Sequence, residues 1–124
     1  MSDTYELYQE GRARLKQGLA AQATVPLEKA KRREPDKASI REALGLAYCR
    51  LKRWEDAETE FRALLDISPA DDYAHYVLGR ILEQLGRRQE ANRHYKLASS
   101  LKPDSKRYSS RILDLDPDRE GEAD

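Results

Sequence analysis

The chain has 124 residues, of which 39% are hydrophobic and 37% charged, with a formal net charge of zero and one cysteine. This length is typical of one domain, a single cysteine cannot form an internal disulfide, and the abundance of Ala, Leu, Glu, Lys and Arg favours helices over strands. Because the sequence contains neither a membrane-spanning apolar stretch nor a secretory signal, we expect a soluble cytoplasmic protein without a membrane partner.

A period of 34 residues runs through the chain. Four kinds of residue recur at this spacing in three consecutive units: Gly11, Gly45 and Gly79; Ala23, Ala57 and Ala91; Leu27, Phe61 and Tyr95; Pro35, Pro69 and Pro103. The offsets between these four marks are the same in every unit, which chance does not produce. Repetition at a fixed period of roughly 20 to 50 residues is the sequence signature of stacked repeats.

Each unit predicts two helices. In chain order, the first helices are expected over residues 4–17, 37–51 and 71–85, and the second helices over 19–33, 54–67 and 88–101. The repeated prolines end the second helices, because proline cannot continue a helix and its predecessor avoids helical geometry. Asp36, Asp71 and Asp104 are the expected N-caps of the helices that follow. Pro26 lies inside a predicted helix, so we expect that helix to bend or to start late.

The repeated glycine and alanine are small for a mechanical reason. Gly45 shares one face of its predicted helix with Leu44 and Tyr48, while Ala57 and Phe61 belong to the facing stripe of the second helix. A larger side chain at Gly45 or Ala57 would push the two helices apart where they cross.

This pattern resembles the tetratricopeptide repeat family. The matching residues in unit two are Leu44, Gly45, Tyr48, Ala57, Phe61 and Pro69, and in unit three Leu78, Gly79, Leu82, Ala91, Tyr95, Ala98 and Pro103. Unit one matches less well, because Glu10 precedes Gly11 and Arg14 stands where unit two has Tyr48. The resemblance covers residues 4 to about 103, most of the chain.

The resemblance implies an all-α fold, a right-handed superhelical solenoid of three antiparallel helix pairs with a closing helix. The expected repeats are residues 4–35, 38–69 and 72–103, followed by a capping helix over 104–115. Tyr108, Ile112 and Leu115 have helical spacing and would cover the last repeat, as solenoid ends require. Residues 116–124 are expected to be an acidic disordered tail.

Catalytic, metal-binding and nucleic-acid-binding patterns are weak. Cys49 is the one candidate nucleophile, but no loop offers an oxyanion hole beside it. His75 and His94 lie 19 residues apart, with no cysteine or acidic cluster at ligand spacing. Basic clusters at 29–34, 50–53 and 87–88 are interleaved with acids. We therefore expect no enzyme activity, no cofactor, no metal and no nucleic-acid partner.

One face of the first helices carries an unusual set of aromatic residues. The pattern Y-x-x-Y-x-x-x-R occurs at Tyr5 and again at Tyr73, at equivalent positions of units one and three. In tetratricopeptide proteins this face lines the concave groove that binds peptides. The resemblance therefore implies a peptide-binding groove formed by Tyr5, Tyr8, Arg12, Glu42, Leu46, Cys49, Tyr73, Tyr76, Arg80 and Glu83. The alternative is that the tyrosines pack between adjacent first helices, and the two roles are compatible.

These features predict a protein–protein interaction module, an adaptor or scaffold. The alternative function is a structural unit that self-associates or stacks within a larger complex. Chaperone-binding members of the family hold a C-terminal carboxylate with a clamp of Lys, Asn and Arg, but the equivalent positions here are Tyr8, Arg12, Ala43, Tyr73 and Val77. We therefore expect a different peptide partner.

The charge distribution suggests what that partner is. Residues 114–124, DLDPDREGEAD, contain six acidic residues and one arginine, which leaves 22 basic and 17 acidic residues in the rest of the chain. A positive body with Arg12 and Arg80 on the groove favours an acidic or aromatic-acidic segment. The chain's own tail is such a segment, so it is expected either to visit the groove weakly or to remain a solubilising extension.

Overall fold

The computed structural model describes residues 3–106 and 108. Within these residues the chain forms six helices and no strand: α1 (Thr4–Lys16), α2 (Ala20–Arg33), α3 (Ala38–Arg50), α4 (Trp54–Ile67), α5 (Asp72–Gln84) and α6 (Arg88–Leu101). Each boundary lies within one residue of the position that the periodicity predicts. The all-α prediction is confirmed.

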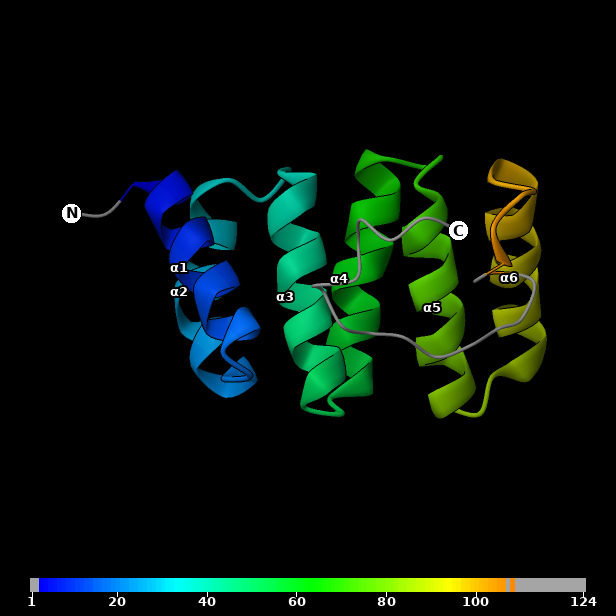
Figure 1. Cartoon of the computed structure of the whole chain (residues 1–124), viewed down its shortest axis with the longest axis horizontal. Coiled ribbons are helices and arrows are strands. Elements are labelled where there is room, and N and C mark those ends of the chain that lie inside the picture. The colour runs from blue at the N-terminus through cyan, green and yellow to red at the C-terminus, as the bar shows by residue number, and fades with distance from the viewer. Residues whose placement is uncertain (1–2, 107, 109–124) are drawn as a thin grey trace.

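The helices pack as three consecutive pairs. The most extensive contacts join α1 to α2, α3 to α4 and α5 to α6, while α2 packs on α3 and α4 on α5 to join neighbouring pairs. The pairs stand side by side in chain order along the longest axis of the molecule (Figure 1). Because α1 also contacts α3, the first helices of these two neighbouring repeats lie next to each other.

The repeated glycines lie where the two helices of a pair approach most closely. A Cβ atom added at Gly11 would lie 2.4 Å from Leu27 Cγ, and one at Gly45 would lie 2.5 Å from Phe61 Cε2. At Gly79 the nearest atom, 2.6 Å away, belongs to Tyr95. Such distances are shorter than carbon–carbon contact allows, so the bulky residue of each second helix fills the space that its glycine leaves open.

The turns inside the pairs also follow the repeat. Gly18 and Gly86 have φ values of +78° and +81°, the left-handed region that glycine adopts without a steric penalty. The equivalent residue of the second repeat is Lys52, with φ of +58°. Repeat two therefore makes the same turn with a residue that is less suited to it.

The predicted N-caps are partly wrong, and the repeat explains why. Asp71 caps α5 by accepting a hydrogen bond from the Ala74 N–H at 3.0 Å, as expected. The equivalent of Asp71 in the second repeat is Lys37, not Asp36, and α3 begins after Lys37 without a side-chain cap. After α6 the equivalent residue is Ser105, whose Oγ accepts from the Tyr108 N–H at 3.4 Å. Asp36 and Asp104 precede the capping position by one residue.

Pro26 does not delay its helix. The helix α2 begins at Ala20, which is equivalent to the first residues of α4 and α6, and continues through Pro26 to Arg33. An interior proline removes one backbone hydrogen bond and crowds the preceding turn. Pro26 is buried, as are Ala23, Leu27 and Ala30 on the same helix, so packing of this face holds the helix together.

The predicted closing helix lies mostly outside the described residues. Lys106 and Tyr108 are helical, and Tyr108 is buried against the last repeat. The remainder of the predicted capping helix and the acidic tail over 116–124 fall beyond the part of the chain that the structure describes. None of the six helices is long and apolar enough to cross a membrane.

Candidate functional site

The first part of the predicted groove lies on α1. Tyr5 is 68% exposed, the largest exposed fraction among the described large apolar side chains. Further along the helix, Arg12 Nη1 donates a hydrogen bond to Tyr8 Oη at 2.9 Å, and its guanidinium lies 5.8 Å from the Tyr8 ring centre. Residues four apart lie on the same helix face, which is why this pair can form. The contact holds an aromatic ring and a positive charge together.

A small pocket opens beside these tyrosines. It measures about 70 Å³ and is lined by Thr4, Tyr5, Tyr8, Glu34, Lys37, Ser39 and Ile40. The rings and Ile40 supply apolar walls, while Lys37 and Glu34, 3.7 Å apart, supply charges of both signs at exposed positions. The pocket spans the start of α1, the turn after α2 and the start of α3, so two repeats are needed to form it.

The predicted tyrosines of α5 belong to an aromatic cluster. The Tyr73 and Tyr76 ring centres lie 6.5 Å apart, and Tyr76 lies 5.9 Å from Tyr95 and 5.2 Å from Tyr108. The Tyr108 hydroxyl donates to the Asp72 carboxylate. Tilted rings at these separations attract one another. Tyr76 of α5 therefore packs against Tyr95 on α6 and against Tyr108, whereas Tyr73 is half-buried at the edge of the cluster.

Arg80 and Glu83 lie one turn apart at the other end of α5. Arg80 Nη1 is 3.8 Å from the Glu83 carboxylate, and the Tyr95 hydroxyl donates to the same carboxylate. Burial, together with this hydrogen bond to a negative group, raises the pKa of Tyr95. The predicted positive charge of Arg80 is thus partly balanced by its neighbour on the same helix face.

The middle of the predicted groove contributes mainly buried side chains. Leu46, Cys49 and Tyr76 all belong to the hydrophobic core, while Glu42 is half-buried. Burial raises the pKa of the Cys49 thiol, which disfavours the thiolate that a nucleophile requires. Leu46, Cys49 and Tyr76 therefore support the face from beneath, and the accessible groups are concentrated on α1 and at the edge of α5.

The sequence prediction missed part of this surface. Thr4, Glu34, Lys37, Ser39 and Ile40 line the pocket but were not assigned to the groove. Ser39 was detectable, because it occupies the repeat position of Tyr5 and Tyr73. Glu34 and Lys37 come from the turn between repeats, and their approach to α1 follows from packing that the repeat pattern does not specify.

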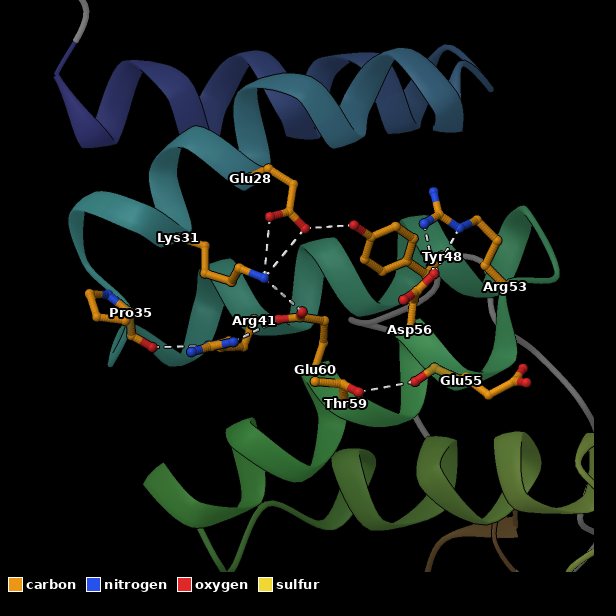
Figure 2. Close-up of polar contacts among 10 residues, drawn as sticks. All are labelled: Glu28, Lys31, Pro35, Arg41, Tyr48, Arg53, Glu55, Asp56, Thr59 and Glu60. Atoms are coloured by element: carbon orange, nitrogen blue, oxygen red, sulfur yellow. Dashed lines mark hydrogen bonds and ion pairs between the residues drawn. The ribbon is translucent and has the colours of Figure 1, made fainter.

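A polar network fixes the second repeat against the first (Figure 2). Glu60 on α4 is only 3% exposed, yet its carboxylate lies 3.0 Å from Lys31 Nζ and 2.9 Å from Arg41 Nη1. Lys31 also contacts Glu28, which accepts a hydrogen bond from the Tyr48 hydroxyl at 2.6 Å. The network joins α2, α3 and α4 and thereby holds α3 in register beside α1.

The charge on Glu28 is stabilised by this network. Burial opposes ionisation of the carboxyl, but hydrogen bonds from Tyr48 and Lys31 and the nearby positive charges outweigh it, so the pKa of Glu28 lies below its ordinary value. The Arg53 guanidinium lies 4.7 Å from the Tyr48 ring centre and covers its outer side. These groups contact one another, and their role is structural.

Solved structures resemble this fold closely. MamA superposes with a TM-score of 0.85 at 22% identity, over 89% of this chain and 64% of MamA. YrrB, described as a TPR protein with an unusual peptide-binding site, gives 0.84 at 19% identity, over 89% and 57% of the two chains. The first TPR of Spaghetti (RPAP3), bound to the HSP90 peptide SRMEEVD, gives 0.83 at 21% identity, over 86% and 85%. This chain thus spans less than two thirds of the first two proteins.

Family models agree with the fold. The comparison with curated protein sequences gave no match. Two models, each described as a tetratricopeptide repeat, match residues 8–72 and 73–105. Together with the three helix pairs and the glycine crossings, these matches establish that the chain belongs to the tetratricopeptide repeat family.

Proposed function

We propose that this protein is a peptide-binding interaction module, acting as an adaptor or scaffold, and that it holds an extended peptide along the first helices of its repeats. The observation that carries the proposal is the exposed Tyr5 beside the pocket between α1 and α3. Tyrosine and arginine are enriched at binding hot spots, because each combines a large contact area with polar groups that form hydrogen bonds. Tyr5, Tyr8 and Arg12 supply aromatic surface, hydroxyl groups and positive charge within about two helical turns.

The remaining predicted residues extend this site. Tyr73 and Arg80 on α5 stand at repeat positions equivalent to Tyr5 and Arg12 on α1, so a peptide crossing the first helices meets similar groups at both ends. Ser39 and Glu42 on α3 provide polar contacts between them, above buried Leu46. The first helices are held side by side by the packing between repeats, so the site is largely formed before a partner arrives, which lowers the entropic cost of binding.

The partner is proposed to be an acidic or aromatic-acidic segment. Arg12 and Lys37 lie near the aromatic rings at one end of the site, where a carboxylate would form charge-assisted hydrogen bonds while an apolar side chain enters the pocket. Arg80 offers a weaker second anchor, since Glu83 already lies 3.8 Å from it. We do not propose the chaperone tail bound by RPAP3, because Ala43 and Val77 replace polar clamp residues.

A non-catalytic role is part of the proposal. The single cysteine is buried, its pKa is raised, and no family of enzymes is among the matches. The lone cysteine, which leaves no internal disulfide, supports a cytoplasmic location.

The alternative, an assembly unit that stacks through its ends, fits the N-terminal end poorly. In repeat two, Tyr48 donates a hydrogen bond to Glu28 on the preceding helix, and both Tyr48 and Leu44 are buried. The equivalent residues of α1 are Glu10 and Arg14, which suit contact with water rather than with another repeat. At the other end, Leu97 and Leu101 on α6 are 45% and 44% exposed. If the protein self-associates, it should do so through α6, and light scattering tests whether it does.

The test is a peptide selection followed by affinity measurements. Peptides selected from a random library on the full chain should be rich in Asp, Glu and aromatic residues, and Tyr8→Ala/Arg80→Ala should weaken their binding about tenfold or more, roughly 1.4 kcal/mol. Tyr5→Ala should also weaken it, without affecting the fold, since that side chain is largely exposed. The matched control is Val25→Ala/Arg32→Ala on α2, which removes an apolar and a positive group away from the site and should change affinity less than about twofold. Equal losses in both double variants would contradict the proposed site.

A further inference from the structure

Two histidines that the sequence places far apart meet between α5 and α6. His75 Nδ1 lies 3.1 Å from His94 Nδ1, and His75 Nε2 lies 2.9 Å from the Pro69 carbonyl oxygen. His75 is 8% exposed, and His94 is half-buried. Neither residue belongs to the proposed peptide site.

The contacts define which nitrogens carry protons. A carbonyl oxygen only accepts, so His75 Nε2 carries the hydrogen and donates to Pro69. In the neutral ring His75 Nδ1 is then an acceptor, and His94 Nδ1 must be the donor that faces it. The ring centres lie 5.3 Å apart, whereas the two Nδ1 atoms lie 3.1 Å apart. The difference is about the width of one imidazole ring. The nitrogens therefore face each other nearly in line, as in a shared N–H···N bond, rather than converging on a third point as metal ligands do.

The preceding repeat has an ion pair at the equivalent position. The residues equivalent to His75 and His94 are Arg41 and Glu60. Arg41 Nε donates to the Pro35 carbonyl at 2.9 Å, and Arg41 Nη1 donates to Glu60 at 2.9 Å. Two contacts correspond in the two repeats: the one between the paired side chains and the one to the carbonyl oxygen of the repeat proline. The contact between the helices of the pair thus has the same geometry in both repeats but not the same response to protons.

The charges around the pair come from α4 and α6. From α4, Arg62 faces His94, and Arg62 is itself bound by Glu58 at 2.8 Å and Glu90 at 2.5 Å. From α6, the negative charge of Glu90 and the positive charge of Arg93 also act on His94. Burial, followed by the positive charges of His75 and Arg62, lowers the pKa of His94, and Glu90 offsets this only in part. On α5, Asp71 and Asp72 precede His75 by one turn, but each is committed to a hydrogen bond with another group.

We propose that His75 and His94 form a proton-responsive contact that makes the packing of α5 on α6 depend on pH. A first proton enters at His94 Nε2 and leaves the Nδ1–H···N bond intact. A second proton has only His75 Nδ1 to enter, where it places two N–H groups face to face and removes the acceptor. The doubly protonated pair therefore has no hydrogen bond between the rings and two like charges in contact. The equivalent contact of the preceding repeat, between Arg41 and Glu60, contains no imidazole ring.

The sign of the effect follows from proton linkage. A histidine whose pKa is lower in the folded than in the unfolded chain binds fewer protons when folded, so stability rises with pH wherever the unfolded chain is protonated. Because the pKa of His94 is lowered, the stability that neutral His94 contributes is present above the ordinary histidine pKa of about 6.5 and is lost as pH falls below it. Glu28 and Glu90, whose pKa values lie below the ordinary carboxyl value, lose their charge only at lower pH.

The first measurement uses the unmodified chain. Nitrogen-15 NMR of the imidazole rings should show His94 protonated at Nδ1 and His75 protonated at Nε2 near pH 8, where free histidine is neutral. On acidification the pair should titrate in two separated steps, because the two sites interact. Two histidines that titrate independently, each in a single step near about 6.5, would overturn the proposal.

The second measurement exchanges the pairs between repeats. For the wild type, the denaturant concentration at the midpoint of unfolding should fall strongly between about pH 7 and pH 5. For His75→Arg/His94→Glu, which places the Arg–Glu pair of repeat two in repeat three, this decrease should be less than half as large. The converse variant, Arg41→His/Glu60→His, should steepen the loss. Equal pH dependence in wild type and the first variant would contradict the proposal, and if that variant fails to fold, the NMR titration of the unmodified chain decides.

Discussion

At the scale of single residues, size and backbone conformation determine the repeat. Glycine is required at the crossing because Leu27, Phe61 or Tyr95 occupies the place of its missing side chain. These positions were predictable, since a small residue facing a large one recurs with the period. The burial of Leu46 and Cys49 was not, because helical spacing alone does not separate a side chain on the groove from one beneath it.

The crossing gives the first prediction. Gly45→Leu should lower the free energy of unfolding by about 1–3 kcal/mol, because the introduced side chain enters space held by the Phe61 ring. Phe61→Ala alone should also destabilise, by creating a cavity. Chemical denaturation of both single variants and the double variant checks this. The double variant should lose less than the sum of the two, since the introduced leucine fills part of the cavity, and additive losses would show that the two positions do not share one contact.

The turn residue Lys52 gives the second prediction. Its φ of +58° is costly for a residue with a Cβ atom, and the other two repeats have glycine at this position. Lys52→Gly should therefore raise the free energy of unfolding by up to about 1 kcal/mol, as for left-handed residues at helix ends. The control is Lys29→Gly on an exposed face of α2, which should destabilise by about the same amount. A loss of stability at Lys52 comparable to that at Lys29 would mean that the turn is not strained.

At the scale of helices, local signals and long-range contacts differ in how far sequence predicts them. The six helices were predictable to within one residue, because proline and glycine mark their ends. Two N-caps were predicted one residue too early, because aspartate, a common N-cap residue, precedes the true capping position at Asp36 and Asp104. The network around Glu60 was not predictable, since Lys31 and Arg41 lie on two other helices and approach Glu60 only after the repeats have packed.

That network gives the third prediction. Glu60→Ala should destabilise the chain by several kcal/mol, at or below the roughly 3–5 kcal/mol of a broken buried ion pair, because Lys31 and Arg41 keep some access to water. Asp56→Ala is the control, since its pair with Arg53 is 2.7 Å long but about half-exposed, and it should cost less than about 1 kcal/mol. Thermal unfolding of both variants measures the difference. Similar melting temperatures would show that burial does not strengthen the Glu60 contacts.

At the scale of the whole molecule, the repeat architecture arranges separate helices into one surface. The family and the fold followed from the period, whereas the pocket beside Tyr5 depends on how the turn after α2 meets α1. The accessible Tyr and Arg groups are therefore more concentrated near the N-terminal end than the sequence indicated. The acidic segment over 114–124 lies outside the described residues, and its relation to the site remains a prediction.

The segment gives the fourth prediction. A synthetic peptide with the sequence DLDPDREGEAD, added to a chain that ends at residue 113, should bind weakly and shift the NMR signals of Tyr8 and Arg12. Binding should weaken steeply with salt, because screened charges supply most of the attraction. A peptide of the same length with Asn in place of each Asp and Gln in place of each Glu is the control. If neither peptide shifts these signals at low salt, the segment does not compete for the proposed site.

The most direct test of the peptide-binding proposal is to map where a selected peptide lies on the full chain by NMR chemical-shift perturbation. We predict that the largest shifts fall on the first helices, at Tyr5, Tyr8 and Arg12 on α1 and at Tyr73 and Arg80 on α5, with smaller shifts at Ser39 and Glu42 on α3. The second helices, represented by exposed Val25 on α2, should change little. Shifts concentrated on α2, α4 and α6, or no peptide that binds at all, would contradict the account.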